Sequence, residues 1–141
     1  MGEPVIVAGG GIGGLTTALT LHEIGVPVRV FESAMTIRPF GVGINLQPNA
    51  VRELNDLGLA DRLPDIGVEA EEWALVGRNG NDVWAEPRGR HAGYRWPQFA
   101  VHRSELQMLL LDAVRKRCGS DRVIEAHRLH TYEQPADSVT A

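Results

Sequence analysis

The chain has little of the chemistry that stabilises secreted or metal-bound folds. Its 141 residues contain a single cysteine, Cys118, which excludes an internal disulfide and a cysteine-based zinc site. The formal net charge of -4 provides no basic surface for nucleic acid or for an anionic membrane. A lone thiol and the lack of a basic leader sequence indicate a cytoplasmic protein.

Long apolar runs are also missing. No stretch approaches the roughly 20 apolar residues that a membrane-spanning helix needs. The N-terminal apolar run, Val5 to Ala8, ends at a series of glycines, so we expect neither a signal peptide nor a membrane partner. The remaining composition, 43% hydrophobic and 23% charged, is typical of one soluble globular domain.

The first thirty-two residues carry the clearest pattern in the chain. A short apolar strand leads into the turn Gly9 to Gly14, which is followed by a helical run to Glu23 and a second strand, Val28 to Phe31. Gly9, Gly11 and Gly14 occupy the three glycine positions of G-x-G-x-x-G. In a strand–turn–helix context these positions provide a tight turn, room for a pyrophosphate and close helix–strand packing.

An acidic residue completes this pattern. Glu32 ends the second strand, eighteen positions after Gly14, where a carboxylate can accept hydrogen bonds from the two hydroxyls of an adenosine ribose. The same carboxylate would repel a 2′-phosphate. The residues therefore predict that FAD or NAD, rather than NADP, is bound, with the phosphates at the helix N-terminus.

Hydrophobic spacing predicts a mixed α/β chain beyond this point. We expect helices after an N-cap at Asn49, over residues 59–63 and from Arg103 onwards, with Gly119 as the stop of the last. We expect strands over residues 44–46, 73–76, 83–84, 99–102, 123–126, 128–133 and from 138, the second and third of which form a small antiparallel hairpin around turn residues 77–82. Since the last strand is cut off at Ala141 and the sheet is narrow, we expect a truncated protein.

Four stretches together resemble the single-component FAD-dependent aromatic hydroxylases, the class of p-hydroxybenzoate and salicylate hydroxylases. They are residues 9–14, Glu32-Ser33, residues 41–50 with 54–59, and residues 102–106. Residues 37–39, 41–45, 86–89 and 105–108 are similar to the phenazine-modifying members of that class. The resemblance implies an incomplete Rossmann-like FAD-binding domain of the GR2 type. Residues 1–141 would be its N-terminal portion, with the rest of that domain and the substrate domain absent.

The resemblance also implies roles for individual residues. Gly11, Ile12, Gly13 and Gly14 would face the FAD pyrophosphate, and Glu32 would bind the ribose with Ser33 beside it. The loop over residues 41–47 would run near the flavin ring, with Asn45 and Gln47 as the polar candidates there. Arg103 would direct its guanidinium at the pyrophosphate or ribityl chain, and Gln107 would reach the same part of the cofactor. The cofactor-binding set is Gly9, Gly11, Ile12, Gly13, Gly14, Glu32, Ser33, Gly43, Asn45, Arg103 and Gln107.

The activity implied for the full-length protein is hydroxylation of a small aromatic substrate with NAD(P)H and O2 through a flavin hydroperoxide. Because the flavin carries the oxygen chemistry, no residue here is assigned a catalytic role, and the fragment alone is expected to be inactive. No metal site is expected, since His127 and His130 lack a suitably spaced carboxylate. Unpaired sheet edges suggest a homodimer.

The sequence also allows other interpretations of these residues. Gln107 could pair with Ser104 in a capping box instead of contacting the cofactor. Arg38 is interpreted as a surface charge, Asn45 and Gln47 could be turn formers, and the tryptophans could be core or hairpin residues. A NAD-binding dehydrogenase or reductase module would share the glycine turn and Glu32, but it does not account for Arg103 or for residues 41–47. The short chain also fits a non-catalytic dinucleotide-binding or interaction module.

Overall fold

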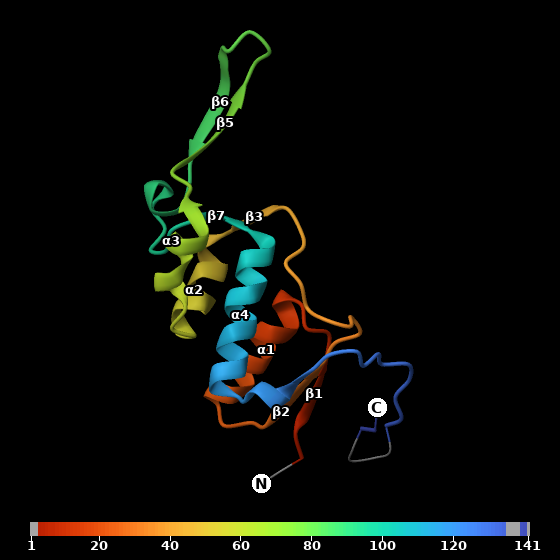
Figure 1. The fold of residues 1–141 in the computed structure, drawn as a ribbon. Helices are drawn as coiled ribbons and strands as arrows, with labels where there is room; N and C mark the ends of the chain where they lie inside the picture. The colour runs from red at the N-terminus through yellow and green to blue at the C-terminus, as the bar shows by residue number, and fades with distance from the viewer. Residues whose placement is uncertain (1–2, 135–138, 141) are drawn as a thin grey trace. The chain divides into compact units, whose positions relative to one another are not determined.

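The computed structural model describes residues 3–134 and 139–140. The chain forms two compact units. Unit 1 comprises Met1–Pro39 and Gln107–Ala141, and unit 2 comprises Phe40–Leu106. Figure 1 shows the elements of both units along the chain. Each unit has its own small sheet and its own helical cover, so each is described by itself.

Unit 1 is built on a parallel sheet of three strands. Its order is β1 (Val5–Ala8), β2 (Val28–Phe31) and β8 (Val123–Ile124), with β2 in the centre. Val5 pairs with Val28, and Val30 pairs with Val123. The side chains of Val28 and Val30 are buried because they alternate with the exposed Arg29 on the central strand.

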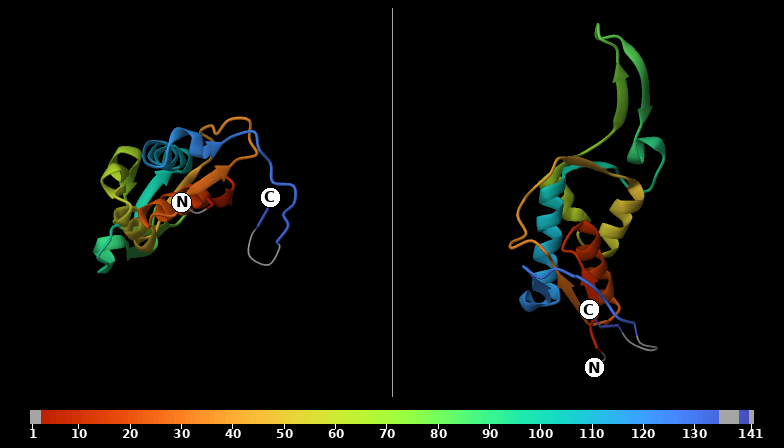
Figure 2. Two further views of the ribbon diagram at one scale, coloured as in Figure 1. Left: turned by 90° about the horizontal axis from the view of Figure 1, so that it is seen from below. Right: turned by 90° about the vertical axis from the view of Figure 1, so that its right-hand side faces the viewer.

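Helix α1 (Ile12–Glu23) connects β1 to β2 and packs against both strands, as Figure 2 also shows. Its apolar residues Leu15, Ala18 and Leu19 are completely buried. The helix ends with Gly25 at a φ of 74°, the left-handed conformation that glycine adopts without strain. Strand, turn, helix and second strand therefore confirm the βαβ pattern predicted from the sequence.

Helix α4 (Arg103–Arg117) is the longest helix of the described chain, and its residues from Gln107 onwards belong to unit 1. Leu110 and Val114 are completely buried on it. After Gly119, at a φ of 115°, the 3₁₀ turn η3 (Ser120–Arg122) leads into β8. The predicted start at Arg103 and the predicted glycine stop are both confirmed.

Unit 2 contains an antiparallel sheet in the order β3 (Gly43–Leu46), β7 (Phe99–His102) and β4 (Gly67–Glu69). Helix α2 (Pro48–Asp56), the 3₁₀ turn η1 (Ala60–Arg62) and helix α3 (Leu63–Ile66) connect β3 to β4. Buried Val51, Leu54 and Leu63 contribute the helical side of the core. Residues 44–46 and 99–102 are strands, as predicted.

The predicted hairpin is present as β5 (Glu72–Val76) and β6 (Asp82–Pro87), and it projects from the rest of unit 2 (Figure 1). Trp73 and Trp84 pack edge to face across it, with ring centroids 5.3 Å apart. Both rings stay more than two-fifths exposed, so they are hairpin residues and not core residues. The segment after the hairpin contains the 3₁₀ turn η2 (Gly89–Ala92).

Two helix boundaries in unit 2 differ from prediction. The N-cap of α2 is Gln47, not Asn49, because Pro48 occupies the first helical turn, where its fixed φ and missing N–H are tolerated. The helix predicted over residues 59–63 instead becomes η1 followed by α3, and Pro64 lies inside α3 at its first turn. Strand β4 directly after α3 was not predicted.

The predicted C-terminal strands are shorter in the structure or missing from it. Strand β8 spans two residues instead of four. Residues 128–133 form no strand, since only an isolated bridge joins Glu133 to Thr140, and an extended segment without a neighbouring strand has unpaired backbone groups. Of the strand predicted from residue 138, residues 138 and 141 lie outside the described residues. In the described part of the chain, no helix is long and apolar enough to cross a membrane.

Candidate functional site in the glycine turn

The glycine turn of unit 1 adopts the conformation that its sequence predicts. Gly9 has a φ of 110°, and its N–H donates to the carbonyl of Phe31 at 2.7 Å, which fastens the turn to β2. Gly11 is the N-cap residue of α1 and has no side chain to cover the first N–H groups of that helix. Beside Gly11 and Gly13, the space where a Cβ would lie is open.

Gly14 serves a different purpose in the same turn. A Cβ on this residue would collide with the carbonyl oxygen of Gly9 and would lie 3.2 Å from Cγ1 of Val7. The absence of a side chain therefore lets α1 approach β1. Gly9, Gly11 and Gly14 thus match the tight turn, the open approach and the close packing of the dinucleotide-binding pattern.

Glu32 lies against this turn and is held by three hydrogen bonds. Its Oε2 accepts the N–H of Gly10 at 2.7 Å, and its Oε1 accepts the N–H of Ala34 at 2.7 Å and the hydroxyl of Ser33 at 3.1 Å. These donors, the N–H of Ala34 foremost, lower the pKa of the Glu32 carboxyl although partial burial opposes them. Glu32 is therefore an oriented carboxylate at neutral pH, with Ser33 beside it on the surface.

Gln107 contacts the opposite side of the same glycine. Its Nε2 donates to the carbonyl oxygen of Gly10 at 2.9 Å, across 97 residues of sequence. Gly10 is buried, and its N–H and carbonyl are bound by side chains from two distant segments. A Cβ on Gly10 would lie 2.7 Å from Cδ1 of Ile37. Gly10 was not among the predicted site residues because its partners are remote in sequence.

The capping box considered for α4 is not how these side chains are used. Ser104 is buried, and its hydroxyl lies 2.6 Å from Nδ1 of His102. Gln107 bonds Gly10 instead of the start of its own helix. Because α4 begins at Arg103, one residue before Ser104, that serine is not in the N-cap position on which the capping box depends.

The remaining predicted residues lie in unit 2. Gly43 pairs with His102 in the β3–β7 ladder, and the N–H of Arg103 donates to the carbonyl of Val42 at 3.0 Å. The aliphatic stem of Arg103 passes Gly41, where a Cβ would lie 3.4 Å from its Cβ and Cδ. The arginine is exposed, and within residues 3–134 and 139–140 no carboxylate lies at ion-pair distance from it.

Asn45 pairs with Ala100 in the same ladder, and its side chain is exposed between the inward-facing Ile44 and Leu46. It is a strand residue, so the turn-forming interpretation of Asn45 is wrong. The predicted set is thus divided between the two units. Gly9, Gly11, Ile12, Gly13, Gly14, Glu32, Ser33 and Gln107 belong to unit 1, while Gly43, Asn45 and Arg103 belong to unit 2.

Comparison with known proteins identifies the family. The model of the FAD binding domain matches residues 3–141. The chain belongs to this FAD-binding domain family. Its resemblance to aromatic hydroxylases and its α/β fold class are therefore confirmed, and the cofactor of the family is FAD rather than NAD.

Several curated members of this family are aromatic hydroxylases. The chain is 50% identical over 130 residues to the phenazine 1,6-dicarboxylic acid hydroxylase PhzS of Lysobacter antibioticus, covering 92% of this chain and 32% of that protein. It is 34% identical over 140 residues to the 3-hydroxybenzoate 6-hydroxylase of Polaromonas naphthalenivorans, covering 97% and 35%. The chain thus spans about a third of the length of the relatives it matches.

Solved structures of a monooxygenase and of an FAD-bound protein share the fold. The p-nitrophenol 4-monooxygenase PnpA from Pseudomonas putida superimposes with a TM-score of 0.86 at 25% identity, covering 97% of this chain and 35% of that one. The R204Q variant of Klebsiella pneumoniae HpxO, whose structure contains FAD, superimposes with a TM-score of 0.77 at 30% identity, covering 95% and 34%.

His127 and His130 are exposed, and His127 bonds the carbonyl of Glu125. Within the described residues, no three histidine, cysteine, aspartate or glutamate side chains gather where they could hold a metal ion. Burial raises the pKa of the Cys118 thiol, which disfavours the reactive thiolate.

Proposed function

We propose that residues 1–141 are the N-terminal portion of the FAD-binding domain of a flavin-dependent aromatic hydroxylase. The observation that carries the proposal is the open glycine turn with an oriented carboxylate beside it. The turn has open space beside Gly11 and Gly13, while Glu32 is bound to Gly10 and carries a lowered pKa. An anionic diphosphate with an attached ribose fits both features.

Each residue has a defined part in this proposal. The uncovered N–H groups at the start of α1, near Gly11 to Gly14, hold the pyrophosphate of FAD, and Glu32 holds the ribose hydroxyls with Ser33 beside it. Gln107 positions the turn through Gly10. In unit 2, Arg103 supplies an exposed guanidinium for an anionic part of the cofactor, and Gly43 and Asn45 line the approach of its ring.

The bound flavin supplies the oxygen chemistry, and NAD(P)H supplies the electrons. The names of the relatives motivate the substrate class, a small aromatic compound, with phenazine 1,6-dicarboxylic acid as the first compound to test. The chain's own contribution is to bind and orient the cofactor.

We further propose that the enzyme is cytoplasmic, because the chain has a single cysteine. A homodimer through sheet edges is proposed too, and a monomeric elution profile of the native protein would exclude it.

The test is the absorption spectrum of the purified full-length protein, taken before and after the cofactor is stripped. We expect flavin absorbance, restored when FAD is added back to the stripped protein, and NAD(P)H oxidation that depends on an aromatic compound. A colourless protein that binds no added FAD would refute the proposal. Tight NAD binding without flavin absorbance would favour a dehydrogenase module instead.

A further inference from the structure

Unit 2 contains a pocket that the proposed FAD contacts do not use. Its volume is about 560 Å³, within the range of small-molecule binding sites. The start of α2, the end of β6 with η2, and the segment leading into β7 form its walls. We call it the arginine pocket and define it by Gln47, Arg52, Arg88, Arg95, Trp96 and Gln98.

The pocket is cationic. Three arginines line it, and none of its lining residues is acidic. Guanidinium groups bind carboxylates through paired, charge-assisted hydrogen bonds, so this wall favours a carboxylate-bearing ligand over a neutral one.

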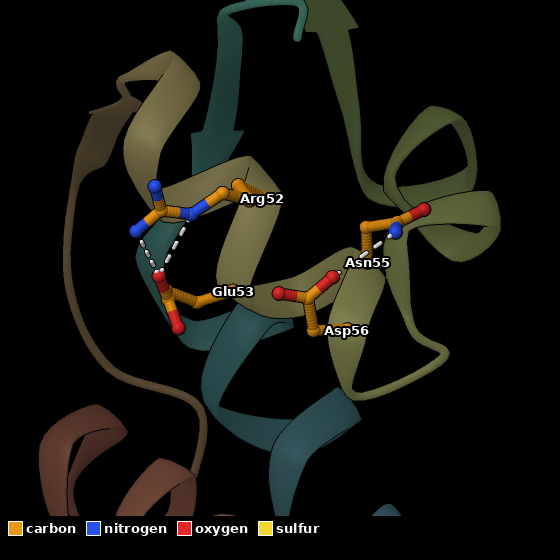
Figure 3. A network of polar contacts seen from close by, with 4 residues as sticks. All are labelled: Arg52, Glu53, Asn55 and Asp56. Atoms are coloured by element: carbon orange, nitrogen blue, oxygen red, sulfur yellow. Dashed lines mark hydrogen bonds and ion pairs between the residues drawn. The ribbon is translucent and has the colours of Figure 1, made fainter.

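The three arginines differ in how far the protein already neutralises them. Arg52 is bound to Oε1 of Glu53 through Nε at 3.0 Å and Nη2 at 2.5 Å, and this contact raises its pKa (Figure 3). The figure also shows Asn55 and Asp56, which bond each other farther along α2. Arg52 is therefore engaged with its own neighbour and contributes less to anion binding.

Arg88 and Arg95 keep hydrogen-bond donors that no carboxylate of the described residues accepts. Arg88 pairs with Glu86 through one terminal nitrogen, yet its Nε is buried and has no hydrogen-bond partner. The Arg88 guanidinium also lies 5.5 Å from the centroid of the Trp73 ring. Its remaining terminal N–H groups are the donors that a ligand carboxylate would bind. The Arg95 guanidinium lies 5.1 Å from the centroid of the Trp96 ring, and among the described residues it makes no ion pair.

Aromatic surface accompanies these charges. The half-buried Trp96 ring and the exposed Tyr94 ring both line the pocket. A flat aromatic ligand can stack on such side chains while its carboxylate reaches the guanidinium groups. Gln47 also lines the pocket and directly follows β3, the strand of Asn45. One wall of the pocket is therefore next in sequence to the strand that we propose lies along the flavin ring.

We propose that the arginine pocket recognises the carboxylate-bearing aromatic substrate, with Arg88 and Arg95 selecting the carboxylate and Trp96 stacking on the ring. This inference rests on the proposed function, because it places the substrate of that flavoenzyme beside β3. It adds the residues that recognise the carboxylate and the ring of that substrate.

The experiment measures ligand binding to the full-length, FAD-loaded protein by calorimetry. The probes are phenazine-1,6-dicarboxylate and unsubstituted phenazine, which share a ring system and differ in charge. We expect Arg88→Gln and Arg95→Gln each to weaken dicarboxylate binding by about 10- to 100-fold, the loss of one charge-assisted hydrogen bond, and to leave phenazine binding unchanged. Arg78→Gln, which removes the same charge from the exposed hairpin turn, is the matched control and should change neither affinity.

Flavin absorbance in the same samples separates the two proposals. A colourless protein would mean that the proposed function has failed. Two results with a yellow protein would overturn the pocket assignment. In the first, the protein binds no dicarboxylate. In the second, both pocket substitutions leave its preference for dicarboxylate over phenazine unchanged. If Arg88→Gln disturbs folding near Glu86, the exposed Arg95→Gln variant decides the question alone, since its side chain has no ion-pair partner to lose.

Discussion

The Glu32→Ala substitution tests the proposed cofactor site most directly. In the structure the carboxylate accepts the N–H groups of Gly10 and Ala34 at 2.7 Å each and the hydroxyl of Ser33 at 3.1 Å. When FAD is bound, the same group would accept the ribose hydroxyls. Removing it leaves those hydroxyls without their acceptor, which costs roughly 1–3 kcal/mol, or about a 5- to 150-fold loss of FAD affinity.

The assay is fluorescence titration of stripped full-length protein with FAD. Glu23→Ala is a matched control, because it removes a carboxylate of the same unit from the exposed end of α1. We expect the control to bind FAD like the wild type. An unchanged FAD affinity in Glu32→Ala would refute the ribose role, even if the protein remained a flavoprotein.

The same residue predicts a pH dependence of stability. The pKa of Glu32 is lowered in the folded chain, so its ionised form is the one that the fold stabilises. This contribution is fully present above the ordinary glutamate pKa of about 4.3 and is lost as the pH falls through the folded-state pKa. Thermal unfolding followed from neutral to acidic pH should therefore show a smaller loss of stability in Glu32→Ala than in the wild type. Parallel profiles for the two proteins would contradict the assigned cause.

Three further substitutions test the geometry of the site. Gly14→Ala should destabilise unit 1 by about 1–3 kcal/mol, because its Cβ would collide with the Gly9 carbonyl. Denaturant unfolding measures this loss of stability. Gly13→Ala is the control, because the space beside Gly13 is open. Gln107→Leu should lower both thermal stability and FAD affinity, because it leaves the buried Gly10 carbonyl without its donor, at a cost of about 1–3 kcal/mol. A variant with the thermal stability and FAD affinity of the wild type would exclude a positioning role for Gln107. Arg103→Ala should weaken FAD by about 1.5–3 kcal/mol through the loss of a charge-assisted contact, and equal FAD affinity at low and high salt in the wild type would speak against that contact.

The local elements were predictable because their causes lie within a few residues of each other. Glycine at positive φ, alternating apolar residues and helical spacing set the β1–α1–β2 unit, the β3 and β7 strands and the start of α4. Prediction was wrong where a local pattern lacked a tertiary partner. Residues 128–133 alternate like a strand, but only Glu133 finds a bridge, to Thr140. The helix predicted over residues 59–63 stopped before Pro64, yet the first turn of α3 accommodates this proline.

The sequence by itself determined the nature of the glycine turn and the identity of the acid beside it. Backbone sterics confine such a turn to glycines. The length of the following helix then lets the second strand pair with the first, which places the acid beside the turn. Only the tertiary structure decided which groups hold Gly10 in place and which arginines share a pocket. Gln107 reaches Gly10 across 97 residues, and the arginine pocket draws Arg88 and Arg95 together with the start of α2. Contacts of this length depend on how separate elements pack, and no local spacing encodes them.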